Sequence, residues 1–149
     1  MTPVVVDDHL LRDVLASERS SDLGGIAPDG IATTGLWLFR LCASLERPAV
    51  ASKLSAPVAA LPEKLQARFR SRLAALPKEI QVLSMRELAW SMAELQNRHR
   101  AEGRSLSAVM VEALAAAHRL DTGIAVSAND VGPSLRASAY ADGVPFHIL

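Results

Sequence analysis

The sequence predicts a single α/β domain over residues 1–149, with a central, mostly parallel sheet of about five strands between two layers of helices. Short runs of β-branched and other apolar residues alternate along the chain with longer segments whose apolar residues recur at helical spacing. The chain has 149 residues, of which 50% are hydrophobic, and it is therefore long enough to bury a core of its own. These two observations define the expected three-layer α/β/α arrangement.

The first part of the chain contains two predicted strands. Residues 2–6 (TPVVV) are typical of a strand buried on both faces of a parallel sheet. Residues 9–16 place leucine and valine at helical spacing and are expected to form a helix. A polar, glycine-rich connection over 17–30 leads to a short strand at 31–34 and a helix at 35–46.

The remainder of the chain continues the alternation. Leu61, Phe69 and their neighbours at helical spacing mark one apolar stripe, with Pro62 in a first helical turn. A later helix is expected to begin at Ser84 and to stop at Gly103. In order, the expected elements are a linker (47–57), a helix (57–76), a strand (79–84), two helices (84–103 and 105–120), a strand (122–127), a turn (128–133), a helix (134–143) and a last strand (144–149).

Charge and composition limit the functional classes. Sixteen basic and sixteen acidic residues cancel, so any nucleic-acid binding must come from a local patch. The single cysteine, Cys42, cannot form an internal disulfide, which fits a reducing compartment. Neither a signal peptide nor a membrane-spanning run is expected, and the sequence therefore favours a cytoplasmic protein without a membrane partner. The four histidines lack the spacing of a zinc site.

Acidic residues follow two of the predicted buried strands. Asp7 and Asp8 come directly after the first strand, and the segment from Ser127 to Asp130 follows the strand at 122–127. In parallel α/β sheets, ligands bind outside the carboxyl ends of the strands, so these acids can meet at one edge. Three interpretations compete: a phosphoryl-accepting switch, a metal-dependent nuclease, and a helix cap without chemistry.

The switch interpretation rests on the first helix and the strand before it. The stretch VVVDDHLLRDVLA looks like the opening of a response-regulator receiver domain, in which paired acids bind magnesium. Such a domain also needs a phosphate-accepting Asp after its third strand and a Lys after its fifth. The stretch ASLERPAVASKLSAP contains no Asp, and the last two strands contain no Lys.

The nuclease interpretation rests on three stretches in chain order: VVVD, IATTGLWLFRL and LSAVMVEALAAAHRLDTGIAVSAND. Taken together, they resemble the PIN-domain family, in the form of actinobacterial toxins of VapC type, and the resemblance covers nearly the whole chain. It implies a PIN-like fold and hydrolysis of RNA phosphodiesters with Mg²⁺ or Mn²⁺. It also implies the toxin of a type II toxin–antitoxin pair, with RNA and an antitoxin protein as partners.

Carried over residue by residue, the resemblance implies a set of acidic site residues. The catalytic residues would be Asp7, Glu112 and Asp130. The metal ligands would be these three together with Asp8 and Asn129. Three or four carboxylates from separate strand ends would supply oxygen ligands and offset the charge of the cation.

Two positions depart from the family pattern. Arg40 stands where the family commonly has a Glu, and Met110 stands where it has an Asp. These departures favour an alternative, a catalytically degenerate PIN-like domain that binds a protein or RNA partner. Ordinary structural roles are also open: Asp7 or Asp8 as a helix cap, Glu112 as a solvated side chain, and Asp130 as a turn residue.

The sequence also predicts self-association as a homodimer. The helices after the first two strands carry more large apolar residues than one buried face needs, including Trp37, Phe39 and Cys42.

The helix at 57–76 carries basic residues at every fourth position, namely Lys64, Arg68 and Arg72. Such a row most often lies on a solvated face.

Overall fold

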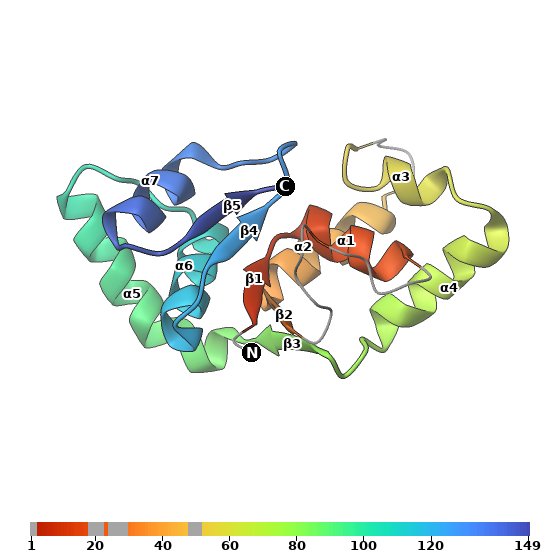
Figure 1. The fold of residues 1–149 in the computed structure, drawn as a ribbon, viewed down its shortest axis with the longest axis horizontal. Coiled ribbons are helices and arrows are strands. Elements are labelled where there is room, and N and C mark those ends of the chain that lie inside the picture. Colours follow the sequence, from red (N-terminus) through yellow and green to blue (C-terminus); the bar gives the residue numbers. More distant parts are fainter. Residues whose placement is uncertain (1–2, 18–22, 24–29, 48–51) are drawn as a thin grey trace.

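The chain has a three-layer α/β/α architecture built on one parallel sheet (Figure 1). The structure is a computed structural model that describes residues 3–17, 23, 30–47 and 52–149. The strands of the described residues are β1 (Val4–Val6), β2 (Ile31–Thr34), β3 (Ile80–Leu83), β4 (Ile124–Val126) and β5 (Phe146–Ile148). They form a sheet in the order β3-β2-β1-β4-β5, in which each neighbouring pair is parallel.

The first strand lies at the centre of the sheet. Val4 pairs with Ile31 of β2, and Val5 pairs with Ile124 of β4. Both pairings are parallel, so the carboxyl ends of these strands meet at the same edge. The strand order differs from the 2-1-3-4-5 order of flavodoxin-like folds, to which receiver domains belong. The receiver interpretation is therefore wrong.

Helices cover both faces of the sheet. They are α1 (Asp8–Ala16), α2 (Gly35–Leu45), α3 (Ala56–Ala59), α4 (Glu63–Ala74), α5 (Met85–Ala101), α6 (Ala108–Leu120) and α7 (Pro133–Ala141). Figure 1 shows α5, α6 and α7 on one side of the sheet and α1, α3 and α4 on the other. Val5 joins the core beneath α5 and α6, whereas Val4 and Val6 join the core beneath α1 and α4. This alternation follows from the two-residue period of a strand.

The single helix expected at 57–76 is two helices in the structure. α3 ends at Ala59, and α4 begins only after Pro62, which takes the N-cap position. Proline has no backbone N–H to donate and restricts the residue before it, so a helix does not continue through Leu61 and Pro62. The expected connection at 17–30 lies mostly outside the described residues, as do residues 48–51 of the expected linker.

The ends of α5 agree with the sequence in position. Ser84 is the N-cap residue, although its side chain makes no capping hydrogen bond. Gly103 has a φ of 82°, and the N–H of Arg104 donates to the carbonyl of His99 at 2.8 Å. This left-handed turn satisfies a carbonyl of the last helical turn and stops the helix.

The surplus of apolar residues on α2 is smaller than the sequence predicts. Trp37 belongs to the core and is almost fully buried, whereas Phe39 is exposed and Cys42 is partly buried. Trp37 reaches the core because it lies in the first turn of α2, at the edge of the sheet. Of these three residues, Phe39 is the exposed one, and self-association stays a prediction. In the part of the chain that the structure describes, no helix is long and apolar enough to cross a membrane.

Candidate functional site

Acidic residues gather at the carboxyl ends of β1 and β4, which are neighbours in the sheet. We call this group, made of Asp7, Asp8, His9, Arg40 and Asp130, the acidic edge. The two aspartates after β1 and the one after β4 come together as the topology requires. Arg40 reaches the group from α2, and His9 lies in the first turn of α1.

Asp7 caps α1 and ties it to the neighbouring strand end. Its Oδ1 accepts a hydrogen bond from the N–H of Leu10 at 2.9 Å, and its Oδ2 accepts one from the N–H of Ser127 at 2.9 Å. The helix-cap interpretation is thus confirmed for Asp7. Burial raises the pKa of Asp7 to about 7, against the lowering effect of the two backbone hydrogen bonds and with a further rise from Asp8 and Asp130.

Asp8 is fully buried and only partly satisfied. Its Oδ1 accepts a hydrogen bond from the N–H of His9 at 3.0 Å. Its Oδ2 has no hydrogen-bond partner, and the nearest cationic group is Nε of Arg40 at 3.3 Å. Burial raises the pKa of Asp8, while the charge of Arg40 lowers it in part.

Arg40 bridges two of the aspartates. Its Nε lies 3.3 Å from Oδ2 of Asp8, and its Nη2 lies 3.3 Å from Oδ2 of Asp130. Its side chain is 43% exposed, so it approaches the buried Asp8 from the solvent side. A guanidinium therefore stands between carboxylates that belong to different strand ends.

Three side chains of the acidic edge could together hold a cation. Ligand atoms of Asp8, His9 and Asp130 lie within 4.8 Å of one another. Two carboxylates and an imidazole suit Mn²⁺ better than Mg²⁺, which prefers oxygen ligands alone. The donor set is nevertheless small for either ion, because both carboxylate oxygens of Asp7 already accept backbone hydrogen bonds.

The surroundings of these ligands oppose cation binding in two ways. The guanidinium of Arg40 contacts both carboxylates that a cation would need. Nη1 of Arg12 lies 3.3 Å from Nδ1 of His9, and an arginine can only donate. Nδ1 therefore accepts this bond in the neutral imidazole, which leaves the proton on Nε2 and no lone pair there for a metal. The residues present fit a divalent cation poorly in this arrangement.

The other residues implied by the family resemblance are not among the ligand atoms that cluster within 4.8 Å of one another. Glu112 is buried, and its Oε1 accepts a hydrogen bond from the N–H of Leu36 at 2.8 Å, so it satisfies the first turn of α2. The solvated reading of Glu112 is therefore wrong. Asn129 is exposed, and its backbone N–H donates to Oγ of Ser127. Met110 lines a small cavity of about 140 Å³ beside Arg40 and Asp130.

Sequence reasoning missed three contributions to the acidic edge. It treated Arg40 as a lost ligand and did not expect it to pair with Asp8 and Asp130. It did not include His9, which follows directly on Asp8. It also missed Arg12, whose Nη1 donates to the carbonyls of Lys53 and Leu54 at 3.0 and 3.1 Å. The adjacent letters DDH and the cation one helical turn later, at Arg12, were the available signal.

A second buried carboxylate lies at the opposite edge of the sheet, where α6 leads into β4 and α7 leads into β5. Asp142 accepts two hydrogen bonds from Arg98, at 2.7 and 2.9 Å. It is also bonded to Nε2 of His118 at 2.8 Å and to Nε2 of His99 at 3.1 Å. Nε of Arg104 donates to Nδ1 of His99 at 2.8 Å, so His99 is the neutral tautomer that donates to Asp142. We call this group the Asp142 network.

The comparisons with known proteins do not identify the chain. No family model matches the sequence, and no curated protein matches it.

Proposed function

We propose that this chain is a catalytically degenerate PIN-like domain that acts by binding a protein partner. The observation that carries this proposal is the position of Arg40, whose guanidinium contacts both Asp8 and Asp130. It stands where the nuclease interpretation requires a divalent cation.

The chemical consequence of a guanidinium in that position is specific. It offsets the charge of the carboxylates, so the edge can stay folded around them. It has no open coordination position, however, and cannot lower the pKa of a bound water to produce a nucleophile. Asp7 is engaged by two backbone N–H groups, and Glu112 by a third. An edge of this kind supports structure and recognition rather than hydrolysis.

A protein partner agrees better with the surface than RNA does. Acidic and basic residues are equal in number, which gives no general attraction for phosphates. Large aromatic side chains are exposed instead, namely Phe39 on α2, Trp90 on α5 and Tyr140 on α7. Aromatic residues are enriched at protein interfaces.

A second candidate is the metal-dependent ribonuclease of a toxin–antitoxin pair, and two observations favour it. Oδ2 of Asp8 is buried without a hydrogen bond, and the pKa of Asp7 is raised to about 7. Perturbed carboxylates of this kind cluster at active sites. For this function Arg40 would have to swing into solvent and leave Asp8, His9 and Asp130 to a cation.

The deciding experiment measures thermal melting with and without MnCl2 or MgCl2, together with cleavage of single-stranded RNA. Wild type should show no cation-dependent rise in melting temperature and no cleavage. Arg40→Gln should gain a response to Mn²⁺, because the competing guanidinium is gone. Arg86→Gln is the matched control, since Arg86 is an exposed arginine in the first turn of α5 and should behave as wild type.

Two results would count against the proposal. Cation-dependent cleavage by wild type that Asp8→Asn abolishes would establish the ribonuclease candidate in its place. An Arg40→Gln variant that stays indifferent to both cations would show that Arg40 does not stand in the place of a metal.

A further inference from the structure

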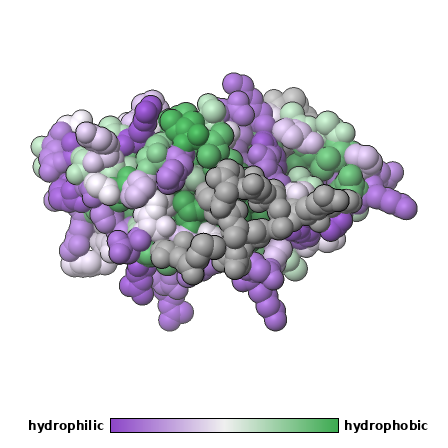
Figure 2. All heavy atoms as spheres, in the orientation of Figure 1, coloured by the Kyte–Doolittle hydropathy of each residue, from purple (hydrophilic) through white to green (hydrophobic). Residues whose placement is uncertain are grey.

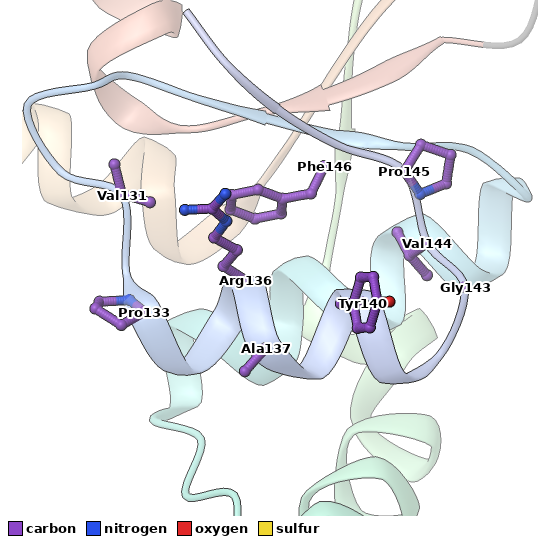
Figure 3. Close-up of a pocket in the computed structure, with 9 residues that line it drawn as sticks. All are labelled: Val131, Pro133, Arg136, Ala137, Tyr140, Gly143, Val144, Pro145 and Phe146. Carbon is purple, nitrogen blue, oxygen red and sulfur yellow. The ribbon is translucent and has the colours of Figure 1, made fainter.

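A groove of about 750 Å³ lies between α7 and β5 (Figure 3). Its lining is mainly apolar and comprises Val131, Pro133, Ala137, Val144, Pro145 and Phe146. Arg136 and Tyr140 of α7 complete it. Its volume is within the range of ligand-binding clefts, and Tyr140 is 87% exposed beside it. The groove is therefore large enough to take several side chains of a partner.

Arg136 is the charged residue in this lining. Figure 3 shows its side chain rising from α7, and Phe146 of β5 lines the same groove. Among the residues that the structure describes, Arg136 has no hydrogen-bond or ion-pair partner. A guanidinium in an apolar groove favours an anionic group, and a carboxylate can accept two hydrogen bonds from it.

The groove is bordered by an open edge of the sheet. Among the described residues, β5 pairs with β4 alone and is the last strand in the sheet order. The N–H of Leu149 donates to the carbonyl of Val126, and the carbonyl of Pro145 accepts from the N–H of Ile124. The carbonyl of Leu149 accepts from the N–H of Ala128. Successive residues of a strand direct their backbone N–H and C=O groups to opposite sides. Phe146 and Ile148 therefore direct these groups away from β4, to the open side of β5. An unprotected edge of this kind is a template for another strand.

We propose that an extended segment of a partner protein adds a sixth strand to β5. Its apolar side chains occupy the groove, and one Asp or Glu carboxylate pairs with Arg136. Alternate residues of a strand share a face, so the segment carries apolar residues at every second position. This inference rests on the proposed function, because it assigns the protein-binding role to one surface.

A second copy of the chain would satisfy these features less well. The segment at 144–149, which would pair with itself, contains no Asp or Glu. A β5–β5 pair would therefore bring no side-chain carboxylate to Arg136, and it would place two copies of this arginine near the same interface. A different protein can supply the apolar strand and the carboxylate together.

The test begins with a library of random twelve-residue peptides displayed on phage and selected on the wild-type protein. Enriched peptides should carry an acidic residue among alternating apolar ones. A synthetic copy of the most enriched peptide should bind by fluorescence anisotropy, and Arg136→Gln should weaken this binding at least about tenfold. Arg86→Gln is the matched control at the other end of the sheet and should leave binding unchanged. Arg136 is exposed, so the variant should melt like wild type.

A second measurement locates the bound peptide. Hydrogen exchange followed by NMR should show slower exchange of the Phe146 and Ile148 amides in the complex, because a new strand would bond them. Replacing the acidic residue of the peptide by its amide should weaken binding to wild type and leave binding to Arg136→Gln unchanged.

Three outcomes would overturn the inference. They are the absence of enriched peptides, enriched peptides whose affinity is indifferent to Arg136→Gln, and preferential binding of a single-stranded RNA twelve-mer that Arg136→Gln weakens. A failure of the proposed function looks different, because it appears as cation-dependent RNA cleavage that requires Asp8. Peptides that bind elsewhere would remove the groove from the proposal and leave the protein-binding role in place.

Discussion

Asp8 and Asp142 are both buried carboxylates at the ends of helices, and the chain surrounds them in opposite ways. Asp8 has one backbone N–H on Oδ1 and a guanidinium 3.3 Å from Oδ2. Asp142 has two short hydrogen bonds from Arg98 and one each from His99 and His118. Burial raises the pKa of Asp8, and the charge of Arg40 offsets this rise only in part. Burial also acts on Asp142, but its hydrogen bonds hold the pKa well below the usual range.

The difference shows that burial does not by itself decide the state of a carboxylate. Desolvation raises the pKa of the carboxyl in both places, and the number and closeness of its donors determine the outcome. The Asp142 network is saturated with donors and holds three helix ends together. Asp8 in the acidic edge has fewer donors, and its pKa is therefore raised where that of Asp142 is lowered.

The largest expected effect is the pH dependence that the acidic edge gives to stability. The pKa of Asp7 is about 7 in the folded chain and near its ordinary value of 3.8 in the unfolded chain. Between these pH values the folded state keeps a proton that the unfolded state has lost. The contribution of Asp7 to the free energy of unfolding is therefore highest below about pH 4 and falls by about 3 to 4 kcal/mol as pH rises through 7.

The measurement is chemical denaturation of wild type and Asp7→Asn from pH 4 to pH 8. The difference in free energy of unfolding between the two proteins isolates Asp7 from the other titrating groups. In Asp7→Asn, the free energy of unfolding should decrease less between pH 4 and pH 7 than it does in wild type. Parallel curves for the two proteins would show that Asp7 is ionised in the folded chain throughout this range.

The next effect concerns the Asp142 network. Asp142→Ala should lower the free energy of unfolding by about 3 kcal/mol at pH 7, because the buried His99 and the half-exposed Arg98 lose their acceptor. The pKa of Asp142 is depressed by folding, so its stabilisation is present above about pH 4 and is lost as pH falls. The loss of unfolding free energy caused by Asp142→Ala should therefore become smaller as pH falls. The contribution of Asp7 changes in the opposite direction, because it increases as pH falls.

Urea denaturation at pH 7 and pH 3 measures both parts of this prediction. Glu79→Ala, which removes an exposed carboxylate before β3, is the control and should change little. A loss below about 1 kcal/mol for Asp142→Ala would mean that the network is no stronger than a surface ion pair.

A smaller effect is expected from Arg40. Arg40→Gln removes the cation nearest to Oδ2 of Asp8 and should cost about 1 kcal/mol at pH 8, since the half-exposed guanidinium is screened by water. At pH 5 the cost should be lower than at pH 8, because burial raises the pKa of Asp8 and a larger fraction of this carboxyl is protonated at the lower pH. Denaturation at both pH values tests this, with Arg86→Gln as reference. An equal cost at the two pH values would contradict the assignment.

The smallest effect is a gain in stability beside the Asp142 network. Oγ of Ser138 is buried in α7 without a hydrogen-bond partner among the described residues. Ser138→Ala should raise the free energy of unfolding by about 0.5 to 1 kcal/mol beyond any gain in helix propensity. Ser91→Ala, on the exposed face of α5, measures the propensity effect alone. A Ser138→Ala variant less stable than Ser91→Ala would mean that the hydroxyl has a partner, such as water.

The fold could be predicted from the sequence because each strand and most helices have a clear local period. Pro62 was correctly placed at the start of a helix, but the separate helix α3 before it was missed, since the leucine stripe continues on either side of the proline. Convergence of Asp7, Asp8 and Asp130 followed from strand ends alone. The sequence did not predict the pairing of Arg40, the capping role of Glu112 or the Asp142 network. Each of these joins residues far apart in the chain, and the distance between them depends on helix packing.

The central position of β1 has a consequence for how the chain folds. One of its two neighbours in the sheet is β4, which follows it in the chain only at Ile124–Val126. The sheet cannot close until the long segment between β1 and β4 has been formed as a loop, and non-local pairings of this kind slow folding. Until then, β1 exposes an apolar edge that β4 covers in the folded sheet. The segment that contains β4 therefore determines when β1 becomes protected, and a nascent chain that stalls before β4 is a species exposed to aggregation.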